Sequence, residues 1–81
     1  MEKNKTIKIP GVTVIAITGE YIRLDQFLKF AGIAETGGMA KEIIAAGGVR
    51  VNGEVVTERG RKLRGGMIVR AGGGVFVVDN G

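Results

Sequence analysis

Residues 49–55 read Val-Arg-Val-Asn-Gly-Glu-Val, an alternation of apolar and polar side chains interrupted by an Asn-Gly pair. Successive side chains of a strand point to opposite faces, so Val49 and Val51 face one side and Arg50 faces the other. An Asn-Gly pair suits the type I′ turn that joins two antiparallel strands. The stretch therefore predicts a β-hairpin with one apolar face and an outward-pointing arginine.

A helical period lies upstream of this hairpin. Apolar residues at positions 24, 27, 28 and 31 follow the i, i+3, i+4, i+7 spacing of one helical face, and Gly32 suits the helix end. On the outer side, Asp25 precedes Lys29 by four positions, so we interpret the two as a simple surface ion pair. Arg23, at the helix start, has no local partner and is expected to reach outward.

A second helix is expected after a short linker. Thr36 is a residue type that caps helix starts well, and the helix should run to about Ala46, where Gly47 and Gly48 stop it. Its positions 39, 40, 43, 44 and 46 share the inner face. Stretches 12–18, 67–71 and 75–78 read as further strands, and 57–66 reads as a basic loop. This order of strand, helix, helix and strands predicts an α+β fold.

The composition narrows the function. The 81 residues suffice for a single domain, which we place at 12–79, after a flexible basic N-terminal tail at 1–11. The absence of Cys and His removes thiolate chemistry, the commonest metal ligands and the usual general base. The net charge of +4 favours a polyanionic partner. We expect a cytoplasmic protein with no enzymatic activity, no cofactor, no metal, no membrane contact and no small-molecule substrate.

The start of the second helix is the first candidate binding feature. Gly37 and Gly38 lie in its first turn, where glycine is unfavourable by up to about 1 kcal/mol relative to alanine. The pair either permits a tight turn between packed helices or leaves the helix start open to a phosphate, and the two readings are balanced. Lys41 shares the solvent face with Gly38 at i, i+3 spacing, which favours contact with a ligand.

The second candidate feature is the basic run 59–64, which reads Arg-Gly-Arg-Lys-Leu-Arg. A charge run is usually a solvated loop. Leu63, however, is expected to pin this loop to the core, and a pinned loop holds its charges in fixed positions, as phosphate contacts need. We therefore favour a binding role for the run, together with Arg50.

Aromatic residues are few. Phe27, Phe30 and Phe76 are interpreted as core or near-core residues, and Tyr21 as half-exposed. A stacking surface for single-stranded nucleic acid is therefore not evident. This favours recognition of folded RNA through its shape and backbone.

Four groups of residues stand in a recognisable order. They are Arg-Leu-Asp at 23–25 with Phe-Leu at 27–28, Ala-Lys at 40–41 with Ile44, Gly-Val-Arg-Val-Asn-Gly at 48–53, and Gly-Arg-Lys-Leu at 60–63. Together they resemble the S-four domain, the RNA-binding domain of the ribosomal small-subunit protein four type. The match covers about Glu20 to Val78. Thr36, Gly37 and Gly38, with a leading strand, make the chain most similar to small stand-alone members of the YaaA/YbcJ-like type.

The resemblance implies two packed helices against a small, mostly antiparallel sheet of about four to five strands, the alpha-L RNA-binding motif. It also implies that structured RNA, ribosomal or transfer RNA first, lies along the second helix and the hairpin. Glu58 stands where relatives often carry a basic residue, which dilutes the positive patch. The residues expected to contact RNA are Arg23, Thr36, Gly37, Gly38, Lys41, Arg50, Asn52, Arg59, Arg61, Lys62 and Arg64.

Two other functions stay open beside that of a monomeric, ribosome-associated RNA-binding protein. Two short helices joined by a short turn are compatible with a DNA-binding helix-turn-helix. The outer face of the second helix, however, offers no Asn, Gln or Arg to read bases. The other alternative is a protein-interaction module in a ribosome-, replication- or repair-associated assembly.

Overall fold

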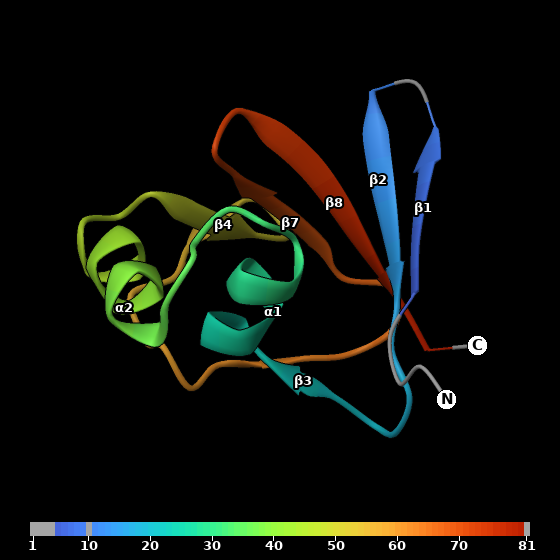
Figure 1. Cartoon of the computed structure of the whole chain (residues 1–81), viewed down its shortest axis with the longest axis horizontal. Helices are drawn as coiled ribbons and strands as arrows, with labels where there is room; N and C mark the ends of the chain where they lie inside the picture. Colours follow the sequence, from blue (N-terminus) through green and yellow to red (C-terminus); the bar gives the residue numbers. More distant parts are fainter. Residues whose placement is uncertain (1–4, 10, 81) are drawn as a thin grey trace.

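The computed structural model describes residues 5–9 and 11–80, and it is an α+β domain built on a six-stranded sheet (Figure 1). The strand order is β1-β2-β8-β7-β4-β5, and every neighbouring pair is antiparallel except β2 and β8, which are parallel. The sheet therefore has more strands than the predicted four to five. Its strands are β1 (Lys5–Ile9), β2 (Val12–Ala16), β4 (Val49–Val51), β5 (Glu54–Val55), β7 (Ile68–Ala71) and β8 (Gly74–Asp79).

The N-terminal segment corrects one prediction. We expected a flexible tail over 1–11, but Lys5–Ile9 forms β1 and pairs with β2 in register, Lys5 opposite Ala16 and Ile9 opposite Val12. Residues 1–4 lie outside the described part of the chain. The segment was interpreted from its basic charge alone. Thr-Ile-Lys-Ile at 6–9 also alternates polar and apolar residues, which is typical of a strand.

The two helices form where the sequence predicts them. They are α1 (Leu24–Phe30) and α2 (Gly37–Ala45), which lie side by side in Figure 1. Thr36 caps α2, since its Oγ1 accepts a hydrogen bond from the backbone N–H of Met39 at 3.1 Å. Gly32 and Gly47 follow the helix ends with φ values of 79° and 80°, a left-handed conformation that glycine adopts without strain.

The predicted hairpin is also present. Val49 and Val51 are buried and Arg50 is exposed, while Asn52 and Gly53 turn the chain with φ values of 51° and 87°. The Asn52 side chain fastens this turn to the sheet, because its Oδ1 accepts a hydrogen bond from the N–H of Ile68 at 2.9 Å. The backbone N–H of Asn52 donates to the carbonyl of Ile68 at 2.8 Å. The turn therefore joins β4 to β5 and is also tied to the start of β7.

The core lies between the helices and the sheet. Phe27 of α1 meets Phe76 of β8 edge to face, with ring centroids 6.1 Å apart. Three residues predicted to face inward do not: Phe30 is 39% exposed, Met39 is 41% exposed, and Ala46 is also exposed. The buried side of α2 is consequently narrower than its apolar stripe, and Ala40 and Ile44 are its fully buried members.

The segment predicted as a basic loop contains a strand. Lys62–Leu63 forms β6, which pairs antiparallel with β3 (Ile22–Arg23) in a separate two-stranded sheet. Leu63 is fully buried, as predicted, and pins the segment to the core. No helix in the described part of the chain is long and apolar enough to span a membrane.

Candidate functional site

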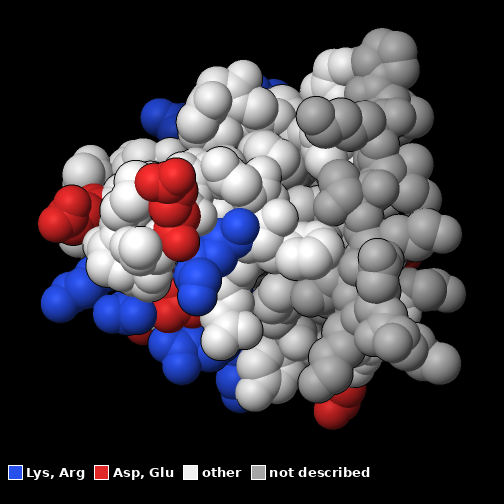
Figure 2. Space-filling model, in the orientation of Figure 1, with Lys and Arg blue, Asp and Glu red and all other residues white. Residues whose placement is uncertain are grey.

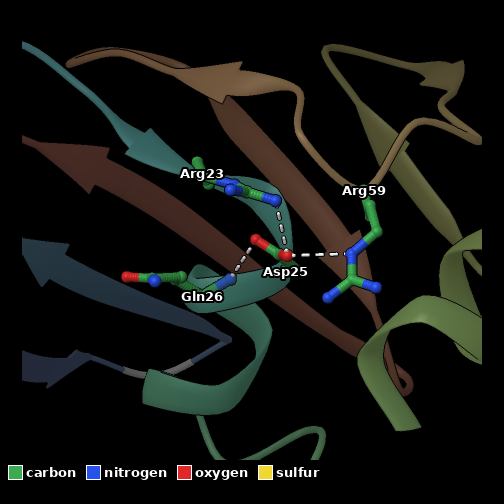
Figure 3. A network of polar contacts seen from close by, with 4 residues as sticks. All are labelled: Arg23, Asp25, Gln26 and Arg59. Atoms are coloured by element: carbon green, nitrogen blue, oxygen red, sulfur yellow. Dashed lines mark hydrogen bonds and ion pairs between the residues drawn. The ribbon is translucent and has the colours of Figure 1, made fainter. Parts of the chain in front are cut away.

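A buried carboxylate organises the start of α1. Asp25 is 5% exposed, and its Oδ2 accepts hydrogen bonds from Nη2 of Arg23 at 3.0 Å and from Nε of Arg59 at 3.1 Å (Figure 3). Its Oδ1 accepts from the backbone N–H of Gln26 at 2.9 Å. We call Arg23, Asp25 and Arg59 the Asp25 cluster.

This arrangement corrects two predictions. Asp25 is not a surface partner of Lys29, and Arg23 is not without a local partner. The cause is tertiary: the 59–61 segment crosses the start of α1, where the N–H of Leu24 donates to the carbonyl of Arg61 at 2.8 Å. The N–H of Asp25 likewise donates to the carbonyl of Arg59 at 3.1 Å. An arginine from a distant part of the sequence thus reaches the carboxylate, and helical spacing rules cannot foresee that.

The charge state of Asp25 follows from these contacts. Burial by itself would raise the pKa of the carboxyl group. The hydrogen bonds from Arg59 and from the Gln26 N–H, with the positive charges of Arg23 and Arg59, outweigh burial and hold the pKa of Asp25 below its ordinary value. Asp25 is therefore ionised at neutral pH and binds both arginines as a carboxylate.

The arginines of the cluster stay accessible. The side chains of Arg23 and Arg59 are 49% and 44% exposed. A guanidinium carries five N–H donors, and each arginine spends one hydrogen bond on Asp25, so most of its donors can serve another acceptor. With two guanidinium groups to one carboxylate, the cluster is a positively charged surface whose donors have fixed positions.

Arg59 also connects the cluster to the second helix. A Cβ atom added at Gly37 would lie 3.6 Å from Nη2 of Arg59, so the guanidinium lies beside the first residue of α2. The starts of both helices therefore converge on Arg59. Gly38 and Lys41 are exposed further along α2, and Thr36 uses its hydroxyl oxygen as the helix cap.

The remainder of the basic run lies against Tyr21. The Lys62 Nζ lies 4.9 Å from the centre of the Tyr21 ring, and the Arg64 guanidinium carbon lies 5.7 Å from it, both within cation–π range. Tyr21 is 43% exposed, as expected of a half-exposed aromatic residue. Arg61, which comes directly before Lys62, is exposed. Figure 2 shows Lys and Arg side chains gathered along the lower left of the molecule, next to α2.

Two expected contact residues do not join this surface. Arg50 points away from the helices, because its neighbours Val49 and Val51 are buried beneath them. It lies directly opposite Arg70 on the outer face of the sheet. The side-chain oxygen of Asn52 already accepts a hydrogen bond from the N–H of Ile68. The structure thus gathers Arg23, Gly37 and Arg59 at one place, with Lys62 and Arg64 beside Tyr21, and leaves Arg50 elsewhere.

Sequence reasoning missed the contacts of three residues, two at this site and one on the outer face of the sheet. Asp25 was paired with Lys29, although Arg23 stands only two positions before it. Tyr21 was not connected with Lys62, because their contact depends on the pairing of β3 with β6. Arg70 was passed over, although it alternates with the apolar Val69 and Ala71 in the same way as Arg50 does with its neighbours.

The sequence is similar to that of a known domain family and of a curated bacterial protein. A family model for the S4 domain, the S-four domain that the sequence motifs resemble, matches residues 15–79. A similar protein is the "Probable ribosome maturation protein RlbA" of Bacillus subtilis (strain 168). It is 46% identical over 67 residues, which cover 82% of this chain and 94% of that protein.

Proposed function

The chain belongs to the S4 domain family, and we propose that it binds structured RNA through the Asp25 cluster and the basic run 59–64. Its general role is RNA binding or ribosome association, as the family and the similar protein indicate. That relative is named for ribosome maturation, so ribosomal RNA is the first proposed partner and transfer RNA the second. We propose a monomer that acts in the cytoplasm and catalyses no reaction.

One observation carries the proposal. Asp25 holds Arg23 and Arg59 with their guanidinium groups half-exposed, and Arg59 lies beside the side-chain-free start of α2. Arginines fixed in this way present planar pairs of N–H donors that match phosphate oxygens. Orientation by a buried carboxylate reduces the side-chain entropy that binding would otherwise remove.

The proposed mechanism has two steps. Arg61, Lys62 and Arg64 attract the RNA backbone electrostatically, because each of these side chains is exposed. Arg23 and Arg59 then hold a backbone phosphate next to Gly37, which has no side chain of its own to separate the phosphate from the helix start. Lys41, one turn along α2, would contact the neighbouring phosphate.

The test is a charge reversal at two exposed positions. The double variant Lys41→Glu/Arg61→Glu should lose binding to a labelled ribosomal RNA helix in fluorescence anisotropy at moderate salt. Circular dichroism should show an unchanged fold, since neither side chain is buried. Wild-type affinity should fall linearly on a log–log plot as salt rises, with a slope set by the number of phosphates contacted.

A matched control uses a cation outside the proposed surface. Lys29 is exposed near the end of α1, so Lys29→Glu changes the net charge by the same amount as Arg61→Glu. Only Arg61→Glu should weaken binding by a large factor. Equal losses in both variants would mean that net charge, rather than this surface, determines affinity.

Two competing outcomes are distinguishable in the same assay. Preference for duplex DNA over the RNA helix in competition would instead support DNA binding, although exposed positions 38, 41, 42 and 45 of α2 offer no Asn, Gln or Arg to read bases. Retention of a protein partner at high salt, without RNA affinity, would support the protein-interaction module.

A further inference from the structure

A second cationic surface lies on the outer face of the sheet. Arg50 of β4 and Arg70 of β7 are direct cross-strand neighbours. Both are exposed, while the residues on either side of them in each strand are buried. The two guanidinium groups therefore project from the face of the sheet that is turned away from α1 and α2.

This pair has no internal compensation. Like charges directly opposite each other in a sheet are destabilising. Among the side chains that the structure describes, neither arginine has an ion pair or a hydrogen bond. The contrast with Arg23 and Arg59, which share a buried carboxylate, is direct. The Asp25 carboxylate offsets the charges of Arg23 and Arg59, whereas no carboxylate in the described part of the chain pairs with Arg50 or Arg70.

The pair borders a hollow with a volume of about 610 Å³. None of its ten lining residues is acidic, and six of them are glycines. The glycines have local causes: Gly72 and Gly73 turn the chain with φ values of 60° and 79°, and a Cβ at Gly48 would lie 3.1 Å from the Ile43 carbonyl oxygen. Together the glycines leave exposed backbone along the hollow, next to two arginines that have no acidic partner among the lining residues.

The row of side chains across the sheet refines the chemistry. Arg50 is also opposite Val55, and Arg70 is also opposite Val75, so the order across four strands is Val55, Arg50, Arg70, Val75. This row holds two adjacent cations and no carboxylate, which suits an anion with several acceptor oxygens. A phosphodiester fits that description, because arginine pairs with phosphate oxygens in a bidentate manner.

We infer that Arg50 and Arg70 form a second phosphate-binding site, and that one copy of the chain can hold two separate RNA segments. The inference rests on the proposed function. The Asp25 cluster lies on the helix side and the arginine pair on the opposite face of the sheet, so one short, stiff RNA helix cannot occupy both. The protein would thereby bring two RNA segments together.

The test is a two-step capture with a single RNA hairpin of about ten base pairs, short enough to behave as a stiff rod. A biotinylated copy is immobilised, the full chain is added, and a fluorescent copy is then supplied. The wild-type protein should retain the fluorescent copy, and Arg50→Gln/Arg70→Gln should retain the protein on the immobilised copy but lose most of the fluorescent signal. Lys29→Gln, which also removes an exposed cation, should behave like the wild type.

The outcomes separate the two proposals. If the immobilised hairpin retains no wild-type protein, the proposed function fails and this inference fails with it. If the protein is retained but the second hairpin is never captured, or if the double variant captures it as well as the wild type does, only the two-segment inference fails. The variant should melt no lower than the wild type, because removing the repulsive pair does not harm the free protein.

Discussion

Arg59 donates its Nε–H to Oδ2 of Asp25 at 3.1 Å across a sequence separation of 34 residues. This contact joins the first turn of α1 to the basic run, and it brings the Arg59 guanidinium beside Gly37 of α2. Two segments far apart in the sequence therefore share one ionic contact, and the start of α2 lies beside it. The position of the proposed RNA-binding arginines depends on a single buried carboxylate.

Asp25→Asn should lower the free energy of unfolding by about 1–2 kcal/mol, because charge-assisted hydrogen bonds to a buried group are lost while both arginines stay partly hydrated. Denaturant unfolding followed by circular dichroism measures this difference. Glu54→Gln, at an exposed residue of β5, is the matched control and should stay within about 0.5 kcal/mol of the wild type. A loss no larger than that of the control would show that the cluster does not stabilise the fold.

The stability difference between the wild type and Asp25→Asn should depend on pH in the acid range alone. The pKa of Asp25 is lowered in the folded protein, so its ionisation stabilises the fold above the unfolded value of about 3.9. This contribution is present in full at neutral pH, declines as pH falls below that value, and is lost below the folded pKa. Urea titrations at several pH values should show the two curves converging in acid. A gap that widens in acid would contradict a lowered pKa.

RNA affinity distinguishes positioning from charge in the same variant. Asp25→Asn removes one of eight acidic residues, so the net charge rises from +4 to +5 (12 − 8 becomes 12 − 7). A purely electrostatic account predicts tighter RNA binding. Loss of the carboxylate that orients Arg23 and Arg59 predicts weaker binding, by about three- to tenfold, or roughly 1 kcal/mol. We expect the weaker binding in fluorescence anisotropy, and tighter binding would refute the positioning role of Asp25.

Alanine at the start of α2 should separate folding from binding. A Cβ at Gly37 or Gly38 meets its neighbours at 3.6 Å and 3.8 Å, ordinary contact distances, and neither glycine has a positive φ. Gly37→Ala and Gly38→Ala should therefore leave the free energy of unfolding unchanged or raise it by up to about 1 kcal/mol. The added methyl groups should nevertheless weaken RNA binding, because they cover the helix start. Unchanged affinity in both variants would show that RNA does not approach this backbone.

Asn52 should contribute to stability through two separable effects. Asn52→Ala loses the hydrogen bond from Ile68 and places alanine at a φ of 51°, so we expect a loss of about 1–2 kcal/mol. Asn52→Gly removes the hydrogen bond but suits the left-handed backbone, so it should lose less. Asn52→Asp keeps an acceptor oxygen and should be the mildest. Thermal melts of the three variants should follow this order, and a reversed order would reject the structural role of the side chain.

Much of the fold could be predicted because its signals are local. The Thr36 cap, the Asn52–Gly53 turn and the alternation of Val49, Arg50 and Val51 each depend on residues within a few positions of one another. Such signals operate before any tertiary contact forms. The family resemblance then supplied the packing of helices on a sheet, which the S4 domain match confirms.

The candidate site was predicted less well, because its contacts are long-range. Asp25 and Lys29 satisfy a helical spacing rule, yet burial of Asp25 beneath the 59–61 segment gives the carboxylate to Arg23 and Arg59. Each strand of the β3–β6 pair has only two residues, which is too short for an alternation of apolar and polar side chains to predict it. Arg50 was expected on the outer face of the hairpin, and the structure places it there. Its expected place in one contact face with α2 came from the family resemblance, and the structure puts Arg50 beside Arg70 instead, on the side of the sheet away from the helices.

The parallel pairing of β2 with β8 has a consequence for the order of folding. In the described sheet, β8 pairs with β2 on one side and with β7 on the other, so it joins the β1–β2 hairpin to the β7-β4-β5 portion. The first hairpin can close from neighbouring residues, but its partner Gly74–Asp79 lies some 60 positions later in the sequence. Pairings between strands far apart in the sequence form more slowly than local hairpins do. During synthesis, the β1–β2 hairpin would therefore lack its partner strand in the sheet until β8 has been made.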